Sequence, residues 1–288
     1  VEMWTLFPEA IESDPKMPNA LLGLLKKGGR DANMSVQINA LTSLFRLLDY
    51  FAASGVSYAP YVYKAIIFSL IENHANESVR DFIMVNLASA LASMDQVPVG
   101  VLIEPLVKQT ALKGYSNHDF PTFCVLAKHP RLSVRHGLIL SDLLGKIALN
   151  APIYGRVATL PLLIVINRFP GDPAVVEYVE RYAKVALSML MHVETKDLVA
   201  RRKNVDPTDP KVKDEAENVV IRRTLVLELL GKIIHLGHTA YARKMLPLLR
   251  ALDRQYMQMV GEGDDEEQAG PKRHPGIVSL IRFCGECL

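Results

Sequence analysis

The sequence predicts an all-α protein built from antiparallel helix pairs, and three observations support this. Apolar residues recur at intervals of three and four along most of the chain, and no stretch alternates as a half-buried strand does. Gly and Pro interrupt these stretches where a helix would end and a turn begin. Two segments also return 86 residues later: Leu-Leu-Gly-Lys-Ile at 143–147 and 229–233, and Leu-Pro-Leu-Leu at 160–163 and 246–249.

The clearest helix pair surrounds the Phe-Pro-Gly segment at 169–171. An apolar helical stretch at 160–166 precedes it, and Pro and Gly together favour the end of that helix. Asp172 is suited to the N-cap of the next helix, and Pro173 fits the first helical position, where its missing N–H costs nothing. Apolar residues then resume at helical spacing from Val175. This stretch therefore predicts a helix, a tight turn and an antiparallel helix.

The same signals predict the remaining helices. They are expected at 4–14, 18–27, 35–54, 60–73, 78–94, 98–113, 133–149, 153–169, 174–193, 214–236, 239–260 and from about Gly276 onward. Three segments break the pattern and are expected to be inserted loops, at 115–129 (with one short helix), 194–213 and 261–275. The apolar last helix is expected either to pack on 239–260 or to continue into further repeats.

The predicted second helices begin at a regular interval. Val36 and Val79 lie 43 residues apart, so the 86-residue spacing equals two such intervals. The first apolar residues of these helices are Val36, Val79, Val134, Val175 and Ile221. The gaps between them are 43, 55, 41 and 46 residues, and the longest equals about one interval plus the predicted insertion at 115–129. A helix pair of this length is a supersecondary unit that buries its apolar faces only when it packs on its neighbours.

This period and pairing resemble those of HEAT and armadillo repeats, whose units run about 40 to 47 residues. Leucine-flanked prolines in the first helices, Asp172-Pro173 in a turn, and Val-Arg at the start of second helices (79–80 and 134–135) are similar to the HEAT pattern. The prolines are Pro105, Pro161 and Pro247. The resemblance implies a right-handed α-solenoid of about five to six helix pairs.

The resemblance covers residues 15–260 and implies a single armadillo-like helical (HEAT-repeat) domain over 1–288, carrying the three inserted loops. The chain starts without Met and its last helix reaches the final residue, so we expect a fragment of a longer protein. A fold of this class does not by itself specify a function.

Composition argues against several classes of partner. The 288 residues carry a net charge of +2, so no global field favours nucleic acid, and the aromatic content of 7% is low for a base-stacking surface. No uncharged apolar run approaches the roughly 18 residues of a membrane span. Three cysteines are too few for a disulfide framework, and they predict a cytoplasmic, reducing compartment.

No nucleotide-binding, zinc-protease or hydrolase motif occurs, so no catalytic residue, metal or cofactor is expected. Cys284 and Cys287 form a Cys-x-x-Cys without the second half of a zinc site, and we interpret them as ordinary thiols in a helix. Cys124 near His118-Asp119 could be a nucleophile beside a base. A helix cap next to a buried thiol is the favoured alternative.

Basic residues are the candidate binding residues. On the predicted second helices, a row of cations could meet phosphates or an acidic peptide, or could instead pair with carboxylates of neighbouring repeats such as Glu177, Glu180, Asp142 and Glu228. The row consists of Arg80, Arg135, Lys146, Arg222, Arg223 and Lys232. Arg201, Arg202 and Lys203 could dock a partner or form a solvated loop.

These observations favour a non-enzymatic scaffold that binds a partner protein, or a peptide or helix of it, through a solenoid groove or the loops. Such a chain would work within a larger cytoskeletal, ciliary or trafficking assembly. The alternative is a HEAT-like nucleic-acid-binding protein or DNA-repair enzyme with a basic concave face, which the small net charge disfavours. Small-molecule ligands are not expected, because no motif for one is present.

Overall fold

The computed structural model describes Trp4, Leu6 and residues 8–14, 16–54, 59–73, 76–92, 99–117, 119–151, 154–202, 210–261 and 273–288. Within these residues all regular structure is helical, which confirms the predicted all-α class. The chain divides into two compact units, Val1–Leu143 and Leu144–Leu288, whose boundary falls inside one helix. Each unit is described by itself. In the described part of the chain, no helix is both long and apolar enough to cross a membrane.

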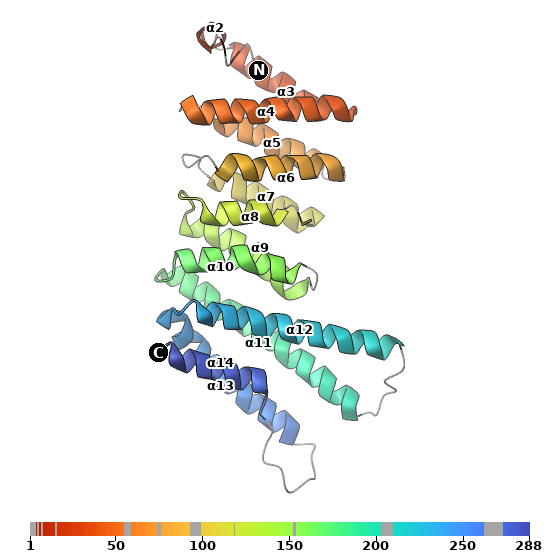
Figure 1. The fold of residues 1–288 in the computed structure, drawn as a ribbon, viewed down its shortest axis with the longest axis vertical. Helices are drawn as coiled ribbons and strands as arrows, with labels where there is room; N and C mark the ends of the chain where they lie inside the picture. Colours follow the sequence, from red (N-terminus) through yellow and green to blue (C-terminus); the bar gives the residue numbers. More distant parts are fainter. Residues whose placement is uncertain are drawn as a thin grey trace. The chain divides into compact units, whose positions relative to one another are not determined.

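The first unit contains seven of the helices drawn in Figure 1 and the beginning of an eighth. They are α2 (Pro8–Glu12), α3 (Lys16–Gly28), α4 (Met34–Ser54), α5 (Ala59–Glu72), α6 (Glu77–Ala92), α7 (Gly100–Lys113), α8 (Asp119–Lys128) and the start of α9 (Val134–Asn150). The second unit contains the end of α9, then α10 (Gly155–Arg168), α11 (Pro173–Arg202), α12 (Pro210–His235), α13 (Thr239–Gly261) and α14 (Pro275–Glu286).

Local signals at helix ends act as predicted. The Asp172 carboxylate accepts a hydrogen bond from the Ala174 N–H at 2.9 Å, and Pro173 is the first residue of α11. Pro105, Pro161 and Pro247 lie inside α7, α10 and α13. Gly114 follows α7 with a φ of 94°, a conformation that glycine adopts without strain. These residues confirm the helix boundaries that the sequence predicts here.

Helices of the first unit form two layers. α4 packs against α6, and α6 against α8, while α3, α5 and α7 follow one another behind them (Figure 1). α4 also packs against α3 and α5, which joins the layers. Leu41, Leu44 and Leu48 of α4 have no exposed surface. Burying a leucine side chain contributes about 1.5–3 kcal/mol, so such residues are the main source of stability in this unit.

The segment 115–129 is not an inserted loop, and the prediction is corrected here. The short helix expected within it is α8, which packs against α6. Phe120 and Phe123 of α8 are buried, and the Thr122 hydroxyl donates a hydrogen bond to the Met84 carbonyl at 3.0 Å. The apolar side chains make α8 part of the core.

In the second unit, α12 packs against α10 and α14, and α11 packs against α12 and α13 (Figure 1). The last helix packs against α13, which is the first of the two arrangements expected for it. Its residues Ile277, Leu280 and Cys284 are buried.

The 86-residue spacing does not represent two helix pairs. The first copies lie in α9 and α10 and the second copies in α12 and α13, so each second copy lies three helices after the first, and α11 alone runs for 30 residues. As a result, the two copies of Leu-Pro-Leu-Leu have different neighbours: α10, which holds Pro161, packs against α12, whereas α13, which holds Pro247, packs against α11 and α14. Similar segments therefore lie in different surroundings.

Gly145 and Gly231 occupy the same place in the two copies of Leu-Leu-Gly-Lys-Ile but have different neighbours. A Cβ atom at Gly145 would lie 2.6 Å from both the Tyr178 hydroxyl and the Tyr182 ring. These two rings are stacked with centroids 5.8 Å apart, and the Tyr182 hydroxyl donates to the Gly145 carbonyl at 3.1 Å. At Gly231 the nearest atom to a Cβ is Leu280 Cδ2 at 3.6 Å, an ordinary contact.

We therefore expect Gly145→Ala and Gly231→Ala to have opposite effects. At Gly145, overpacking costs about 1–3 kcal/mol and outweighs the gain in helix propensity. At Gly231, alanine should raise the free energy of unfolding by up to about 1 kcal/mol. Urea unfolding followed by circular dichroism measures both. Equal effects of the two substitutions would contradict this account of the packing.

Candidate functional site: the helical arm of the second unit

Two long helices of the second unit continue past their neighbours as an arm. α11 has 30 residues and α12 has 26, and both extend beyond the ends of α10 and α14 in Figure 1. The arm comprises residues 192–202 of α11 and 210–224 of α12. No described side chain at 212–224 is buried, and burial along α12 begins at Leu225. The α12 part of the arm is therefore helical without forming part of the core, and among the described side chains of its α11 part only Val193 and Glu194, at the base of the arm, are buried.

The prediction of a loop at 194–213 is wrong for residues 194–202, because these residues continue α11. Six of the nine residues at 194–202 are strong helix formers (Glu194, Lys196, Leu198, Ala200, Arg201 and Arg202), and the first proline follows only at Pro207. Residues 203–209 lie outside the described part of the chain. The same is true of 262–272, which forms most of the predicted loop at 261–275.

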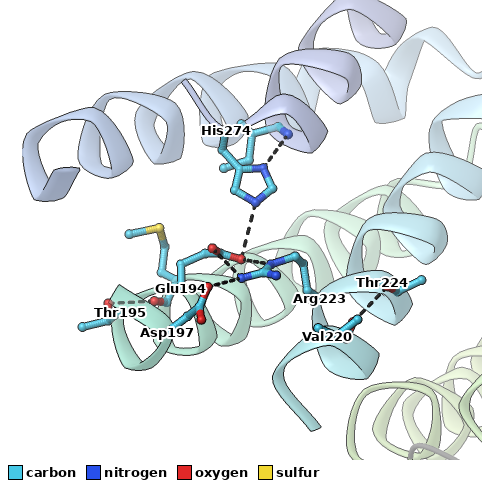
Figure 2. Close-up of polar contacts among 9 residues, drawn as sticks. Glu194, Thr195, Asp197, Val220, Arg223, Thr224 and His274 are labelled. Carbon is cyan, nitrogen blue, oxygen red and sulfur yellow. Dashed lines mark hydrogen bonds and ion pairs between the residues drawn. The ribbon is translucent and has the colours of Figure 1, made fainter. Parts of the chain in front are cut away.

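A group of four polar side chains, here called the anchor cluster, joins the arm to the rest of the unit (Figure 2). Arg223 of α12 donates to Glu194 of α11 through Nε at 2.5 Å and through Nη2 at 3.0 Å. Arg223 Nη2 also donates to Asp197 at 2.9 Å. His274, which precedes α14, lies with Nε2 3.4 Å from the Glu194 carboxylate. The cluster thus connects α11, α12 and α14.

His274 contributes to the cluster through both ring nitrogens. Its Nδ1 accepts a hydrogen bond from the Ile277 N–H at 3.3 Å, which caps α14. Because Nδ1 is an acceptor, the ring proton belongs on Nε2, which faces Glu194 as a donor. The Tyr256 ring meets the imidazole edge-on, with centroids 5.1 Å apart. His274 therefore links the start of α14 to Glu194 of α11.

Glu194 is only 3% exposed. Burial by itself raises the pKa of Glu194, but hydrogen bonds from His274 and Arg223, together with their charge, outweigh burial and lower the pKa below its usual range. The hydrogen bond with Glu194 is also the largest cause of the raised pKa of Arg223. Both partners are therefore charged at neutral pH.

A groove of about 310 Å³ lies between the two helices of the arm. Apolar and small residues of both helices line it, among them Val193, Ala200, Val212, Ala216 and Val219. Its polar lining includes His192, Lys196, Glu215 and Arg222, together with Asp197, which Arg223 already binds. The groove is therefore partly apolar and bordered by charges of both signs.

Arg80, Arg135 and Arg223 of the predicted row form intramolecular ion pairs. Arg80 lies near Glu77 and Asp81 at 3.8 and 3.5 Å, Arg135 binds Glu104 at 3.0 Å, and Arg223 belongs to the anchor cluster. Arg80 is on α6, which packs with α4 and α8, whereas Arg135 is on α9 and reaches α7. These two cations do not line one face of their unit.

The other candidate cations have varied positions. Lys146, Arg222 and Lys232 are exposed, and Arg222 lines the groove of the arm. Arg201 and Arg202 end α11, but their side chains are outside the described part of the structure, as is all of Lys203.

Two of the carboxylates expected to pair with the row, Glu228 and Glu180, bind other cations. Glu228 binds Arg156 at 3.3 Å, and Glu180 binds Lys184 at 2.8 Å and Lys244 at 2.7 Å. Arg80, Arg135 and Arg223 therefore pair with carboxylates, which was the alternative to a free basic row. The carboxylates that they bind differ from those expected.

The cysteines are the remaining chemical candidates. Burial raises the pKa of Cys124, with Lys128 opposing, and burial followed by the nearby Cys287 raises the pKa of Cys284 to about 11. Asp119 accepts a hydrogen bond from the Ser116 N–H at 2.8 Å as α8 begins, and His118 lies outside the described residues. Within the residues that the structure describes, no group of three His, Cys, Asp or Glu side chains could hold a metal ion.

Three members of the anchor cluster, Glu194, Asp197 and His274, are absent from the sequence prediction. They belong to no motif, and Glu194 is separated by 29 residues from Arg223. One local signal was available: Pro275 favours the first helical position, which makes His274 the N-cap. Comparison with protein-family models, with curated proteins and with solved structures gives no match.

We expect Glu194→Gln to lower the free energy of unfolding at pH 7 by about 1.5–3 kcal/mol, because charged hydrogen bonds in a buried site are lost. A carboxyl group with a lowered folded-state pKa stabilises the fold above its unfolded pKa and loses this contribution as the pH falls through the folded value. The wild-type protein should therefore lose more stability than the variant between pH 7 and pH 3.

The matched control is Glu217→Gln on the exposed surface of α12. Denaturant titrations at several pH values should give the wild-type profile for this variant. An identical acid profile for Glu194→Gln and the wild type would contradict the assignment of a charged, buried Glu194.

Proposed function

We propose that this chain is a non-enzymatic helical-repeat scaffold, an α-solenoid of the HEAT and armadillo kind, that binds a partner protein within a larger intracellular assembly. The observation that carries the proposal is the arm, an ordered helix pair that adds almost nothing to the core. Surfaces that are not needed for folding yet are held in a defined geometry are suited to recognition.

The lining of the groove suits an amphipathic helix of the partner as the bound segment. Ala200 and Ala216 are small, so they leave space between α11 and α12 for apolar side chains. Apolar anchors spaced one helical turn apart are the usual way in which a helix occupies such a groove. Lys196 and Arg222 at the border favour acidic residues on the flank of that helix.

Nucleic-acid binding has less support. It requires cations available along one face, but Arg80, Arg135 and Arg223 are occupied by carboxylates of the chain itself. The net charge of +2 also provides little long-range attraction for a polyanion. Binding of a DNA duplex that falls steeply between 50 and 200 mM salt would favour this alternative.

The test begins by introducing a photo-crosslinking residue at Glu215, in the groove, and separately at Ala174, an exposed position of α11 outside it. Illumination of cell extract should yield a defined crosslinked protein only from position 215. That protein is then purified and its affinity for the chain is measured by calorimetry.

Ala200→Arg should weaken this affinity at least about tenfold, because a long cationic side chain fills the groove and leaves apolar groups without contacts. Ala174→Arg is the matched control and should leave the affinity unchanged. A partner that binds Ala200→Arg and the wild type equally well would contradict a role for the groove.

A further inference from the structure

A second cleft lies on α13 and the segment before α14, and it shares no lining residue with the groove of the arm. Here an arginine cleft of about 590 Å³ is lined by Arg250, Asp253, Arg254, Met257 and Arg273. Arg250 and Arg254 are one helical turn apart on α13, so their side chains lie on the same side of the helix. Arg273 joins them from beyond the end of that helix.

The three guanidinium groups differ in their contacts. Arg273 is fixed by an ion pair with Asp253, a carboxylate that is 4% exposed. This pair uses Nε and Nη2 of Arg273, and a guanidinium has five N–H groups, so further donors remain. Arg250 and Arg254 are exposed, and neither has a carboxylate partner among the described residues. Arg254 Nε donates only to the Arg250 carbonyl, at 3.4 Å.

The net charge of the arginine cleft indicates which kind of ligand it can bind. Three guanidinium groups and one carboxylate leave the cleft with an excess of two positive charges. A phosphomonoester carries about −1.5 to −2 charges at pH 7 and three acceptor oxygens, so one such group balances this excess. A side-chain carboxylate carries only one negative charge and fewer acceptor sites.

We propose that the arginine cleft binds a phosphoserine or phosphothreonine side chain of a partner protein. Arg250 and Arg254 bind the phosphate oxygens, and Arg273, held in place by Asp253, supplies a further donor. A nucleic acid would need cations repeated along its backbone. Lys244, six residues before Arg250 on α13, is already paired with Glu180. The proposal does not depend on the groove of the arm or on its occupant.

The test uses a fluorescein-labelled pool of nine-residue peptides with a central phosphoserine and degenerate flanks, and the same pool without phosphate. Fluorescence anisotropy should show binding of the phosphorylated pool, at least about tenfold stronger than that of the unphosphorylated pool. Equal binding of the two pools, or no binding of the phosphorylated pool, would overturn the proposal.

Arg250→Glu and Arg254→Glu are the variants. Each should weaken binding of the phosphorylated pool at least about tenfold, because a charge-assisted contact becomes a repulsive one. Arg243→Glu makes the same charge change at an exposed position of α13 outside the cleft, and it should retain wild-type binding. Circular dichroism verifies that all three variants keep their helices.

An equal loss in Arg243→Glu would show that only the overall charge matters and would overturn the proposal. A DNA duplex of 20 base pairs provides the second comparison. Tighter binding of this duplex than of the phosphorylated pool, with loss of both in Arg250→Glu, would identify the cleft as a nucleic-acid surface instead.

Discussion

The ion pair between Arg223 and Glu194 is the interaction on which the position of the arm in the second unit depends. It joins α11 to α12 where the arm leaves the core, and His274 extends the contact to α14. Removing one member of such a pair is costly, because the remaining charge stays buried without compensation. The cluster therefore favours one relative position of the three helices, which a purely apolar contact would specify less well.

This constraint explains how an exposed helix pair keeps a defined groove. Isolated helices shorter than about 12–15 residues are marginal in water, and the arm buries no described side chain between 212 and 224. Its order comes from continuity with the core helices and from the anchor cluster at its base. For the proposed function, a groove formed before binding would avoid the entropic cost of ordering two helices on association with a partner.

Local sequence features predicted much of the fold, whereas contacts distant in sequence were out of reach. Asp172 and Pro173 define the start of α11, and Pro275 favours the start of α14, because caps and prolines act within one turn. Glu194 lies in a charged segment that was interpreted as a loop, yet its burial depends on Arg223 and His274. The repeat period gave two wrong predictions for a related reason. It reflects similar helix sequences but not which helices pack together, so residues 194–202 of α11 were predicted as part of a loop and α8 as part of an insertion.

Hydrogen–deuterium exchange of the arm's backbone amides tests the central claim most directly. The account predicts that amides of 195–202 and 214–222 exchange slowly in the wild-type protein and at least about tenfold faster in Glu194→Gln, because opening of the arm no longer breaks a charged pair. Amides of α13 around Leu246–Leu249 should keep their protection. Fast exchange throughout the wild-type arm, or equal protection in the two proteins, would contradict the claim that the anchor cluster holds the arm in place.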